Sequence, residues 1–261
     1  MAVERGMQIH QLPSSSTLHR IPYLYGVVLF VFTSAAPAQQ PPSVTQLPTG
    51  GRVISGQVGI QQSGATLKVT QSSARGIVDW STFNVGSQGQ VNFIQPSASA
   101  VTLNRVLDSN PSQIFGRITA TGQVFLTNPS GIYFSPTSTV DVGGLIATTM
   151  GMSASDFMAS GARFKSSNGL GLVLNQGRLT AADGGYIALL APQVRNEGVV
   201  IARLGTVALS SGNAMTLQLN DRNLVKVEVD EGAINGLIEN KSLVKADGGL
   251  VVMSAKAANN L

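Results

Sequence analysis

The carboxylates, which could act as acids, bases or metal ligands, are mostly isolated in this chain. Cleavage of a polysaccharide needs paired carboxylates at a defined separation, or carboxylates that hold a metal beside a base. The only close group is Glu228, Asp230 and Glu231, and most other acids stand alone, as do Asp79, Asp108, Asp141, Asp156 and Asp183. Glu228 and Asp230 share one face of a predicted strand with Lys226. This alternation is typical of a solvated edge strand and argues against an active site.

Nucleophilic and metal chemistry has equally little support. The chain has no cysteine, and its two histidines are His10 and His19. Without histidine beyond residue 19 there is no catalytic triad, imidazole metal site or histidine ligand for haem. Ser242 and Lys245 have the Ser-x-x-Lys spacing of an acyl-transfer site, but that motif needs a helix, and on a strand the two side chains diverge. We predict no enzyme, no metal and no cofactor, with a β-helix carbohydrate-active enzyme as the weakest alternative.

The composition restricts the partners. Charged residues make up 11% of the chain, against about 25% in average globular proteins. Loss of residues 1–38 would remove two basic residues and one acid, lowering the net charge from +4 to +3. The basic residues form no run that suggests nucleic acid. One tryptophan and four tyrosines leave no obvious aromatic platform or pocket for a small-molecule substrate.

Both ends of the chain carry signals. Residues 1–38 resemble a secretory leader, because Arg5 and Arg20 precede an apolar run and Ala36-Pro-Ala38 suits signal peptidase, which predicts cleavage after Ala38. Residues 39–50, rich in Pro and Gln, are expected to be flexible. The chain stops at Leu261, partway through a repeat and without a polar cap. We expect it to be truncated or to continue into a longer exoprotein.

The predicted strands and corners, which would have to position any functional site, recur about every 21 residues in the C-terminal half. Asn175, Asn196, Asn240 and Asn260 are 21, 44 and 20 residues apart, and we interpret the 44-residue interval as two coils, one carrying an insertion. Glycines that each open a short alternating strand recur at positions 122, 144, 185, 205 and 249. An open sandwich would also have short strands, but it would not keep this Asn-to-Gly spacing in phase.

This repeat predicts an all-β fold, a β-solenoid of about 20–22 residues per coil. Coils would stack about 4.8 Å apart through backbone hydrogen bonds. Asparagine suits the corners because it tolerates left-handed backbone angles and its side chains can hydrogen-bond along the axis. The side chains expected in the core are Trp80, Phe83, Ile187, Leu189, Val207 and Leu209.

Two segments are expected to leave the coil. Residues 153–159 read as a single helical turn with Ser153 as its N-cap and with Phe157 and Phe164 as anchors. Residues 215–229 read as an extra-helical β-hairpin that turns at residues 220–223. The hairpin would account for the surplus length in the 44-residue interval.

Two Asn-Pro-Ser segments, at Asn110-Pro111 and at Asn128-Pro129, are separated by 18 residues. The second continues through Ser130 and Gly131 to Ile132. Asn at the first position, Pro at the second and Gly at the fourth are the preferences of a type I turn. Proline also favours an extended residue before it, so a strand over 123–127 should run straight into the turn.

The residues around this turn resemble the haemagglutination-activity domain, the N-terminal secretion domain of two-partner secretion exoproteins. The family turn Asn-Pro-Asn-Gly-Ile reads here as residues 128–132, with Ser130 in place of the second Asn. A second family turn, Asn-Pro-Asn-Leu, is missing, and Gln-Pro-Ser-Ala at residues 95–98 occupies about its place. This makes the chain more similar to the high-molecular-weight adhesins than to the filamentous haemagglutinins. Further family-like segments follow in family order, at residues 77–86, 90–93, 99–106 and 143–149.

The resemblance covers roughly residues 50 to 261 and implies a right-handed parallel β-helix with an N-terminal cap. It implies a secretion-directing, fold-nucleating domain, recognised while unfolded in the periplasm by an outer-membrane β-barrel transporter with periplasmic recognition domains, and exported to the bacterial surface. Exposed strands such as 123–128 could pair with those domains. The turn of residues 128–132, with Asn110 and Pro111, is the expected secretion signal, acting through folding, recognition or both. The alternative is that the domain is itself an adhesin for host glycans or matrix, with the host cell surface as partner.

Overall fold

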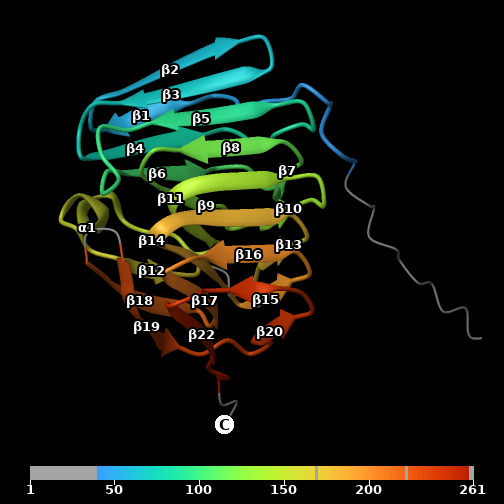
Figure 1. The fold of residues 1–261 in the computed structure, drawn as a ribbon, viewed down its shortest axis with the longest axis vertical. Helices are drawn as coiled ribbons and strands as arrows, with labels where there is room; N and C mark the ends of the chain where they lie inside the picture. Colours follow the sequence, from blue (N-terminus) through green and yellow to red (C-terminus); the bar gives the residue numbers. More distant parts are fainter. Residues whose placement is uncertain (1–39, 168–169, 221–222, 259–261) are drawn as a thin grey trace, which may run out of the picture. The chain divides into compact units, whose positions relative to one another are not determined.

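The computed structural model describes residues 40–167, 170–220 and 223–258 of the chain (Figure 1). These residues form a parallel β-helix in which successive coils stack along one axis, as the repeat predicts. The predicted signal peptide, Asn260 and the hairpin tip at residues 221–222 lie outside the described residues. No helix within those ranges is long and apolar enough to cross a membrane.

Each coil contributes to three faces. Two of these faces belong to one 14-stranded sheet, because the long strands β11 (Thr139–Thr148) and β14 (Arg178–Ala191) pair with neighbours on both. We call the face toward the viewer in Figure 1 the open sheet; it adds to the first parts of β11 and β14 the strands β2 (Val58–Ser63), β3 (Thr66–Gln71), β5 (Gln90–Ile94), β8 (Arg117–Ala120), β16 (Val199–Ala202) and β21 (Val244–Lys245).

The covered sheet adds to the second parts of β11 and β14 the strands β1 (Arg52–Ser55), β4 (Arg75–Trp80), β6 (Val101–Val106), β9 (Gln123–Thr127), β17 (Thr206–Ser211) and β22 (Leu250–Ala255). The third sheet consists of β7 (Ser112–Ile114), β10 (Ile132–Phe134), β13 (Leu172–Asn175), β15 (Gln193–Asn196) and β20 (Leu237–Asn240). Almost all pairs are parallel, and the antiparallel pairs β2–β3 and β1–β4 form the expected N-terminal cap.

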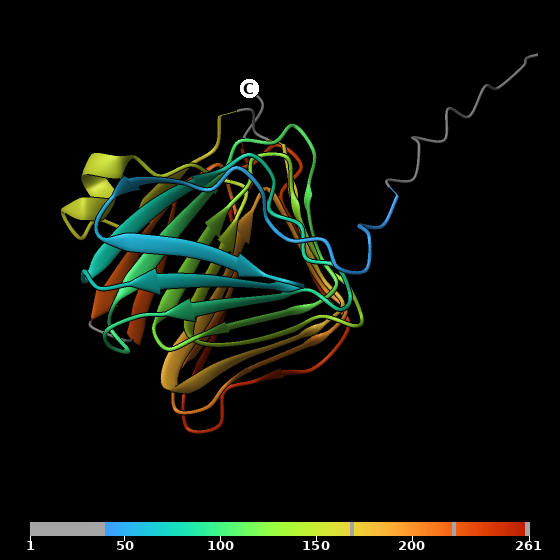
Figure 2. The same cartoon turned by 90° about the horizontal axis from the view of Figure 1, so that it is seen from above.

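The three sheets enclose the inside of the coil (Figure 2), and apolar side chains from all three fill it. The predicted core residues Ile187, Leu189, Val207 and Leu209 are all 0% exposed. Trp80 and Phe83 pack edge to face with ring centroids 5.6 Å apart, and the Trp80 Nε1 donates to Asn104 Oδ1 at 3.0 Å. The core prediction is therefore confirmed.

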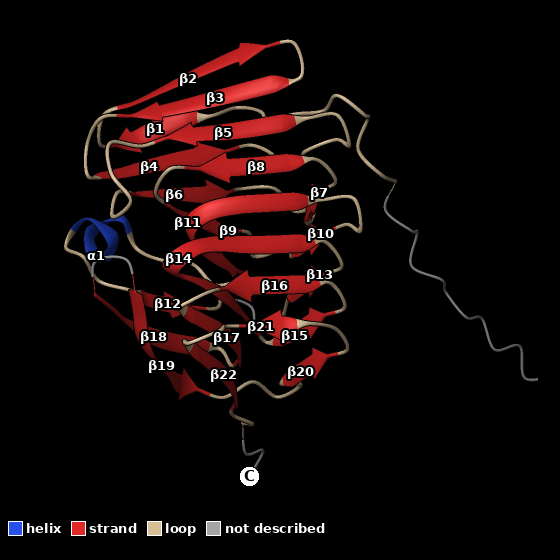
Figure 3. Ribbon diagram, in the orientation of Figure 1, coloured by secondary structure: helices blue, strands red, loops and turns tan. Residues whose placement is uncertain are grey.

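An outer layer covers one face of the covered sheet (Figure 3). It contains α1 (Ala154–Met158) and a three-stranded antiparallel sheet of β12 (Arg163–Lys165), β18 (Ala214–Asn220) and β19 (Asn223–Glu231). Ser153 caps α1 by accepting from the Asp156 amide at 3.0 Å, and Phe157 and Phe164 are fully buried. The capped turn and the hairpin were both predicted; the third strand, β12, was not.

The asparagine repeat is a hydrogen-bonded ladder. Asn175 Nδ2 donates to Asn196 Oδ1, and Asn196 Nδ2 to Asn240 Oδ1, both at 2.8 Å. Asn196 and Asn240 are direct partners in β15 and β20, so the 44-residue interval is one coil carrying the hairpin, and the prediction of two coils is wrong. Asn175, Asn196 and Asn240 do not have a positive φ, so they do not use the tolerance for left-handed angles; Asn175 closes its corner by accepting from the Gly177 amide at 3.1 Å.

The glycines that open the strands of the covered sheet lie one above another on successive coils. At one of these positions the predicted glycine is one residue off. The residue that opens the covered strand of β11 is Gly143, which donates to the carbonyl of Gly122 at 2.8 Å, and Gly185 in turn lies against Gly143. A Cβ here would collide with the backbone of the neighbouring coil. Gly144, the residue predicted for this column, instead makes room for the ring of Tyr186.

Residues 43–49 have backbone partners in the first coil. The Gln88 amide donates to the Val44 carbonyl at 2.7 Å, Thr49 pairs with Thr82, and Leu47 is 4% exposed. The prediction that residues 39–50 are flexible is therefore wrong for this stretch. Sequence composition could not reveal these contacts, because they depend on where the first coil presents backbone amides and carbonyls that its own strands leave unpaired.

Candidate functional site

The two Asn-Pro-Ser segments lie against each other on neighbouring coils. The first connects β6 to β7 and the second connects β9 to β10, at the corner between the covered and third sheets. We call residues 108–112 and 128–132 together the double turn. β7 and β10 pair in register, with Ser112 opposite Ile132, and this pairing fixes one turn upon the other.

Asn128 is the centre of the double turn and is 0% exposed. Its Nδ2 donates to the Asn110 carbonyl at 3.1 Å and to Ser112 Oγ at 2.9 Å, both on the preceding coil. Its backbone amide donates to the Thr148 carbonyl of the following coil at 3.0 Å. One side chain and its backbone thus connect three successive coils.

The predicted β-turn forms at residues 128–131. The Gly131 amide donates to the Asn128 carbonyl at 3.0 Å, and the Ser130 amide donates to Asn128 Oδ1 at 2.9 Å. Gly131 has a φ of +126°, and a Cβ there would lie 3.2 Å from the Leu172 carbonyl oxygen and 3.3 Å from Pro111 Cβ. Glycine is required because the backbone angle and the neighbouring coil both oppose a side chain.

The first turn contributes partners that sequence reasoning missed. Asp108 Oδ1 accepts from the backbone and side-chain nitrogens of Asn110, both at 3.0 Å. Ser130 Oγ donates to the Asp108 carbonyl at 3.0 Å, so the residue that departs from the family turn still binds across the coils. The repeated tripeptide predicts both turns. It does not predict that one turn lies upon the other, because that depends on the path of the chain between them.

The residues of the double turn differ in exposure in the folded domain. Asn128, Ile132 and Ser112 are at most 1% exposed and Gly131 is buried, whereas residues 108–111, Pro129 and Ser130 lie partly or fully at the surface. β9 is buried along its whole length and pairs with β6 on one edge and β11 on the other. The idea that residues 123–128 offer an exposed strand is therefore wrong for the folded state and requires an unfolded chain.

A polar row on the third sheet continues outward from the double turn. Tyr133 Oη donates to Gln176 Oε1 at 2.7 Å, and Gln176 Nε2 donates to Glu197 Oε2 at 2.8 Å. Burial and the nearby Glu197 charge raise the pKa of Tyr133. The hydrogen bond from Gln176, aided by Lys241, lowers the pKa of Glu197.

Several of the acids, both isolated and clustered, are engaged in ion pairs or hydrogen bonds. Asp79 accepts from Arg105 Nε at 2.7 Å, Glu228 pairs with Lys226 at 3.1 Å, and Asp230 accepts from Thr216. Lys226 and Glu228 are exposed on β19, which pairs only with β18, as expected for a charged edge strand. Across the described residues, no group of three acids or histidines could hold a metal ion.

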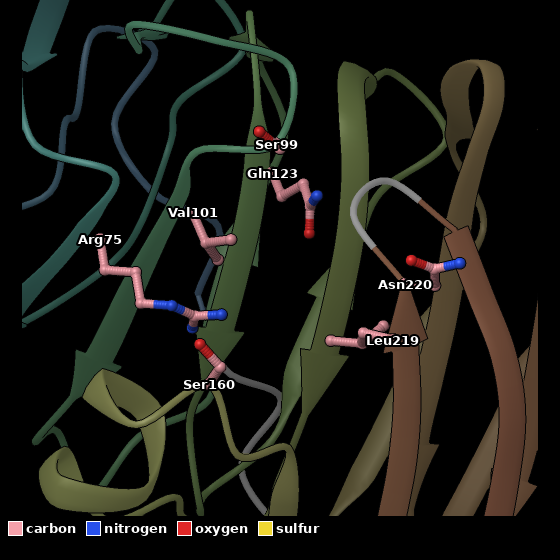
Figure 4. A pocket seen from close by; sticks show the side chains of 7 residues that line it. All are labelled: Arg75, Ser99, Val101, Gln123, Ser160, Leu219 and Asn220. Atoms are coloured by element: carbon pink, nitrogen blue, oxygen red, sulfur yellow. The ribbon is translucent and has the colours of Figure 1, made fainter.

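A hollow of about 400 Å³ lies where the outer layer leaves part of the covered sheet open (Figure 4). Among the described residues, its lining includes Arg75, Gln123, Ser160 and Asn220 and contains no carboxylate. Arg75 donates to the Phe157 carbonyl at 2.9 Å and lies 5.0 Å from the Phe157 ring centre, and burial lowers the pKa of Arg75. Arg75 therefore fastens α1 to the sheet, and the hollow lacks the paired acids of a glycosidase.

Comparison with known proteins gives the family. The model of the TPS secretion domain, the domain that directs two-partner secretion, matches residues 44–261. This chain belongs to the TPS secretion domain family. The match spans the whole β-helix, the double turn and the outer layer. TPS domains are recognised by a partner transporter and belong to secreted exoproteins.

Solved TPS domains have the same fold. The secretion domain of HMW1 from Haemophilus influenzae superposes with a TM-score of 0.74 at 25% identity, over 79% of this chain and 57% of that one. The filamentous hemagglutinin secretion domain gives 0.54 at 17% identity, over 81% and 80%. Both matches confirm the all-β, β-helix prediction, and the first agrees with the predicted likeness to the high-molecular-weight adhesins.

Two curated relatives are heme/hemopexin-binding proteins of Haemophilus influenzae. One, from strain Rd, is 31% identical over 242 residues, and the other is 29% identical over 254 residues. These matches cover 89% and 88% of this chain but only 26% of each relative. The chain thus spans about a quarter of the length of the relatives, and the binding in their name describes those longer proteins.

Proposed function

We propose that this TPS domain directs export through an outer-membrane β-barrel transporter whose periplasmic recognition domains bind the unfolded chain. On this proposal residues 1–38 are a signal peptide cleaved after Ala38, and the domain then folds at the bacterial surface. Because β9 has no free edge once folded, recognition of residues 123–128 must precede folding. We propose neither an enzyme nor a host-glycan adhesin as the primary role.

We further infer that the double turn acts in secretion through folding. The observation that carries this inference is the position of Asn128, fully buried and bonded to the coils on both sides. Closing this corner brings each new coil into register with the one before it. Stacking then buries apolar side chains, which opposes return of the chain through the transporter.

The test compares Asn128→Ala with Asn110→Ala, two asparagines in the same Asn-Pro-Ser context. Asn128→Ala removes three buried side-chain hydrogen bonds, and we expect it to lower the free energy of unfolding by about 3 kcal/mol. The Asn110 side chain is exposed and bonds only to Asp108, so Asn110→Ala should cost under about 1 kcal/mol. Secretion by cells with the partner transporter should fall strongly for Asn128→Ala and little for Asn110→Ala.

Unfolding in urea and protease resistance of the purified chains give the readout of folding. If Asn128→Ala folds with wild-type stability yet is not secreted, the turn acts as a recognition signal and the folding role is wrong. Release of the wild-type chain without the transporter would contradict the two-partner mechanism itself.

A further inference from the structure

The open sheet differs from the other surfaces of the domain in its charges. Ion pairs occur on the third sheet between Arg195 and Glu239, and on the outer layer between Lys165 and Glu231. The first five rungs of the open sheet below its cap strand, β3, β5, β8, β11 and β14, contain no ion pair among their outward-facing described residues. Lys68, Arg117 and Arg178 project from these rungs without a carboxylate partner and are exposed.

The β-helix brings these three cations together from distant parts of the sequence. Arg117 and Arg178 are both in register with Thr139, one on each neighbouring strand, so they stand two rungs or about 10 Å apart. Lys68 lies two rungs beyond Arg117 in the adjacent column. A hollow of about 300 Å³ between the two arginines is lined by Thr139, Asp141 and Thr180.

The rest of these five rungs is hydrophilic and free of aromatic rings, whereas the next strand, β16, presents the half-buried Val199 and Ile201 beside Arg178 and Thr180. The outward side chains of the five rungs are Thr66, Thr70, Gln90, Asn92, Thr119, Thr139 and Thr180, with Ile94 at one edge and Asp141 as the single acid. Hydroxyl and amide groups can hydrogen-bond to sugar hydroxyls, but without rings there is no stacking platform for a neutral sugar. Attraction on this face must therefore come from charge.

We propose that the open sheet is a binding surface for a linear acidic polysaccharide lying along the β-helix axis. One pyranose unit is about as long as the spacing between rungs, so an anionic group on alternate sugars falls beside Arg117 and then beside Arg178. The guanidinium groups bind sulfate or carboxylate in forked pairs, and the threonines bind the hydroxyls between them. This surface lies away from the double turn and is independent of export.

The experiment measures binding of the secreted full chain to heparin, by titration at several salt concentrations. Arg117→Gln with Arg178→Gln should weaken binding roughly tenfold and lower the salt slope by about two. The matched control, Arg163→Gln with Arg203→Gln, removes the same charge from exposed arginines that pair with Asp230 and Asp183, and should change the affinity less than twofold or so. Asp141→Asn should tighten binding roughly twofold.

Three results would overturn the proposal. The wild-type chain could fail to bind heparin, the two double variants could lose the same affinity, or Asp141→Asn could weaken binding. Binding to vesicles of anionic phospholipid without binding to heparin would assign the face to a membrane surface instead. Secretion is measured separately, so loss of export by any variant leaves this result interpretable.

Discussion

The open and covered sheets are built by the same coils, yet their outward faces have opposite character. In register on the covered sheet, the outward column reads Ile77, Leu103, Phe125, Ile146 and Ala188. The corresponding column of the open sheet reads Lys68, Asn92, Thr119, Asp141 and Thr180. β11 and β14 contribute a residue to both columns. The change from polar to apolar outward residues along one strand therefore follows what covers each face.

The outer layer explains the difference. α1, β12, β18 and β19 place Phe157, Phe164 and Met215 on the covered sheet, and strands such as β9 and β17 are then buried on both sides. On the open sheet only alternate residues are buried, as in β3 and β16. A parallel strand thus shows a period of two only where one face meets solvent, and a continuous apolar run indicates a second layer.

Removing the aromatic contact under the outer layer should give the largest loss of stability. Phe125 packs against Phe157 and Phe164, with ring centroids 5.9 and 6.2 Å away. We expect Phe125→Ala to lower the free energy of unfolding by about 4 kcal/mol in urea titrations. Thr119→Ala, at the matching position of the open sheet, should cost under about 1 kcal/mol, and equal losses would contradict the distinction between the sheets.

Removing each of two tyrosine hydroxyls should give smaller and unequal losses of stability. Tyr186 Oη donates to Gln123 Oε1 at 2.6 Å beneath the outer layer, and Tyr133 donates to Gln176 at the surface. Tyr186→Phe should lower the free energy of unfolding by about 2 kcal/mol because it leaves a buried acceptor with one partner fewer. Tyr133→Phe should cost about 0.5 kcal/mol, and the reverse order in thermal unfolding would show that burial does not govern these bonds.

Alkaline pH should act most strongly on the covered side. Burial raises the pKa of Tyr186 well above its ordinary value, so the folded state keeps the phenol neutral while the unfolded chain ionises. Its contribution to stability is constant below pH about 10 and falls as the pH rises further. Tyr186→Phe should flatten the decline measured between pH 10 and 11, and an unchanged slope would remove Tyr186 as its cause.

Acid pH should produce the smallest effect, on the third sheet. The pKa of Glu197 is lowered mainly by the Gln176 hydrogen bond, so the stability it contributes is present above its ordinary pKa. That contribution is lost as the pH falls through the folded-state value. Glu197→Gln should lower the thermal midpoint slightly at pH 7, where the carboxylate contributes, and should make no difference at about pH 3, where the carboxylate is protonated. An equal loss at both pH values would indicate a packing role instead.

Sequence reasoning succeeded where the determining interactions are local or strictly periodic. The turn at Asn128 follows from the backbone preferences of Asn, Pro and Gly, and the helical turn follows from the Ser153 cap. The asparagine ladder follows from a spacing of about one coil. Likewise Ile187 and Leu189 alternate with the period of a strand and point to the core.

It failed where an insertion leaves the coil and returns. The distance from Asn196 to Asn240 fits two coils as well as one coil with a hairpin, and only the pairing of β15 with β20 decides between them. The choice of Gly144 over Gly143 failed for a related reason. Adjacent glycines are equivalent in a pattern, but only one of them lies against the neighbouring backbone.

An all-β coil with its turn residues, its core face and its two excursions can be derived from the sequence, because each depends on contacts within one repeat. The tertiary structure alone decided which sheet is covered, that Asn128 connects three coils, and that Arg117 and Arg178 stand two rungs apart. Those properties arise between coils. Residues that meet across a parallel ladder are separated by a whole coil and any insertion it carries, and that length is free to vary without changing the local pattern.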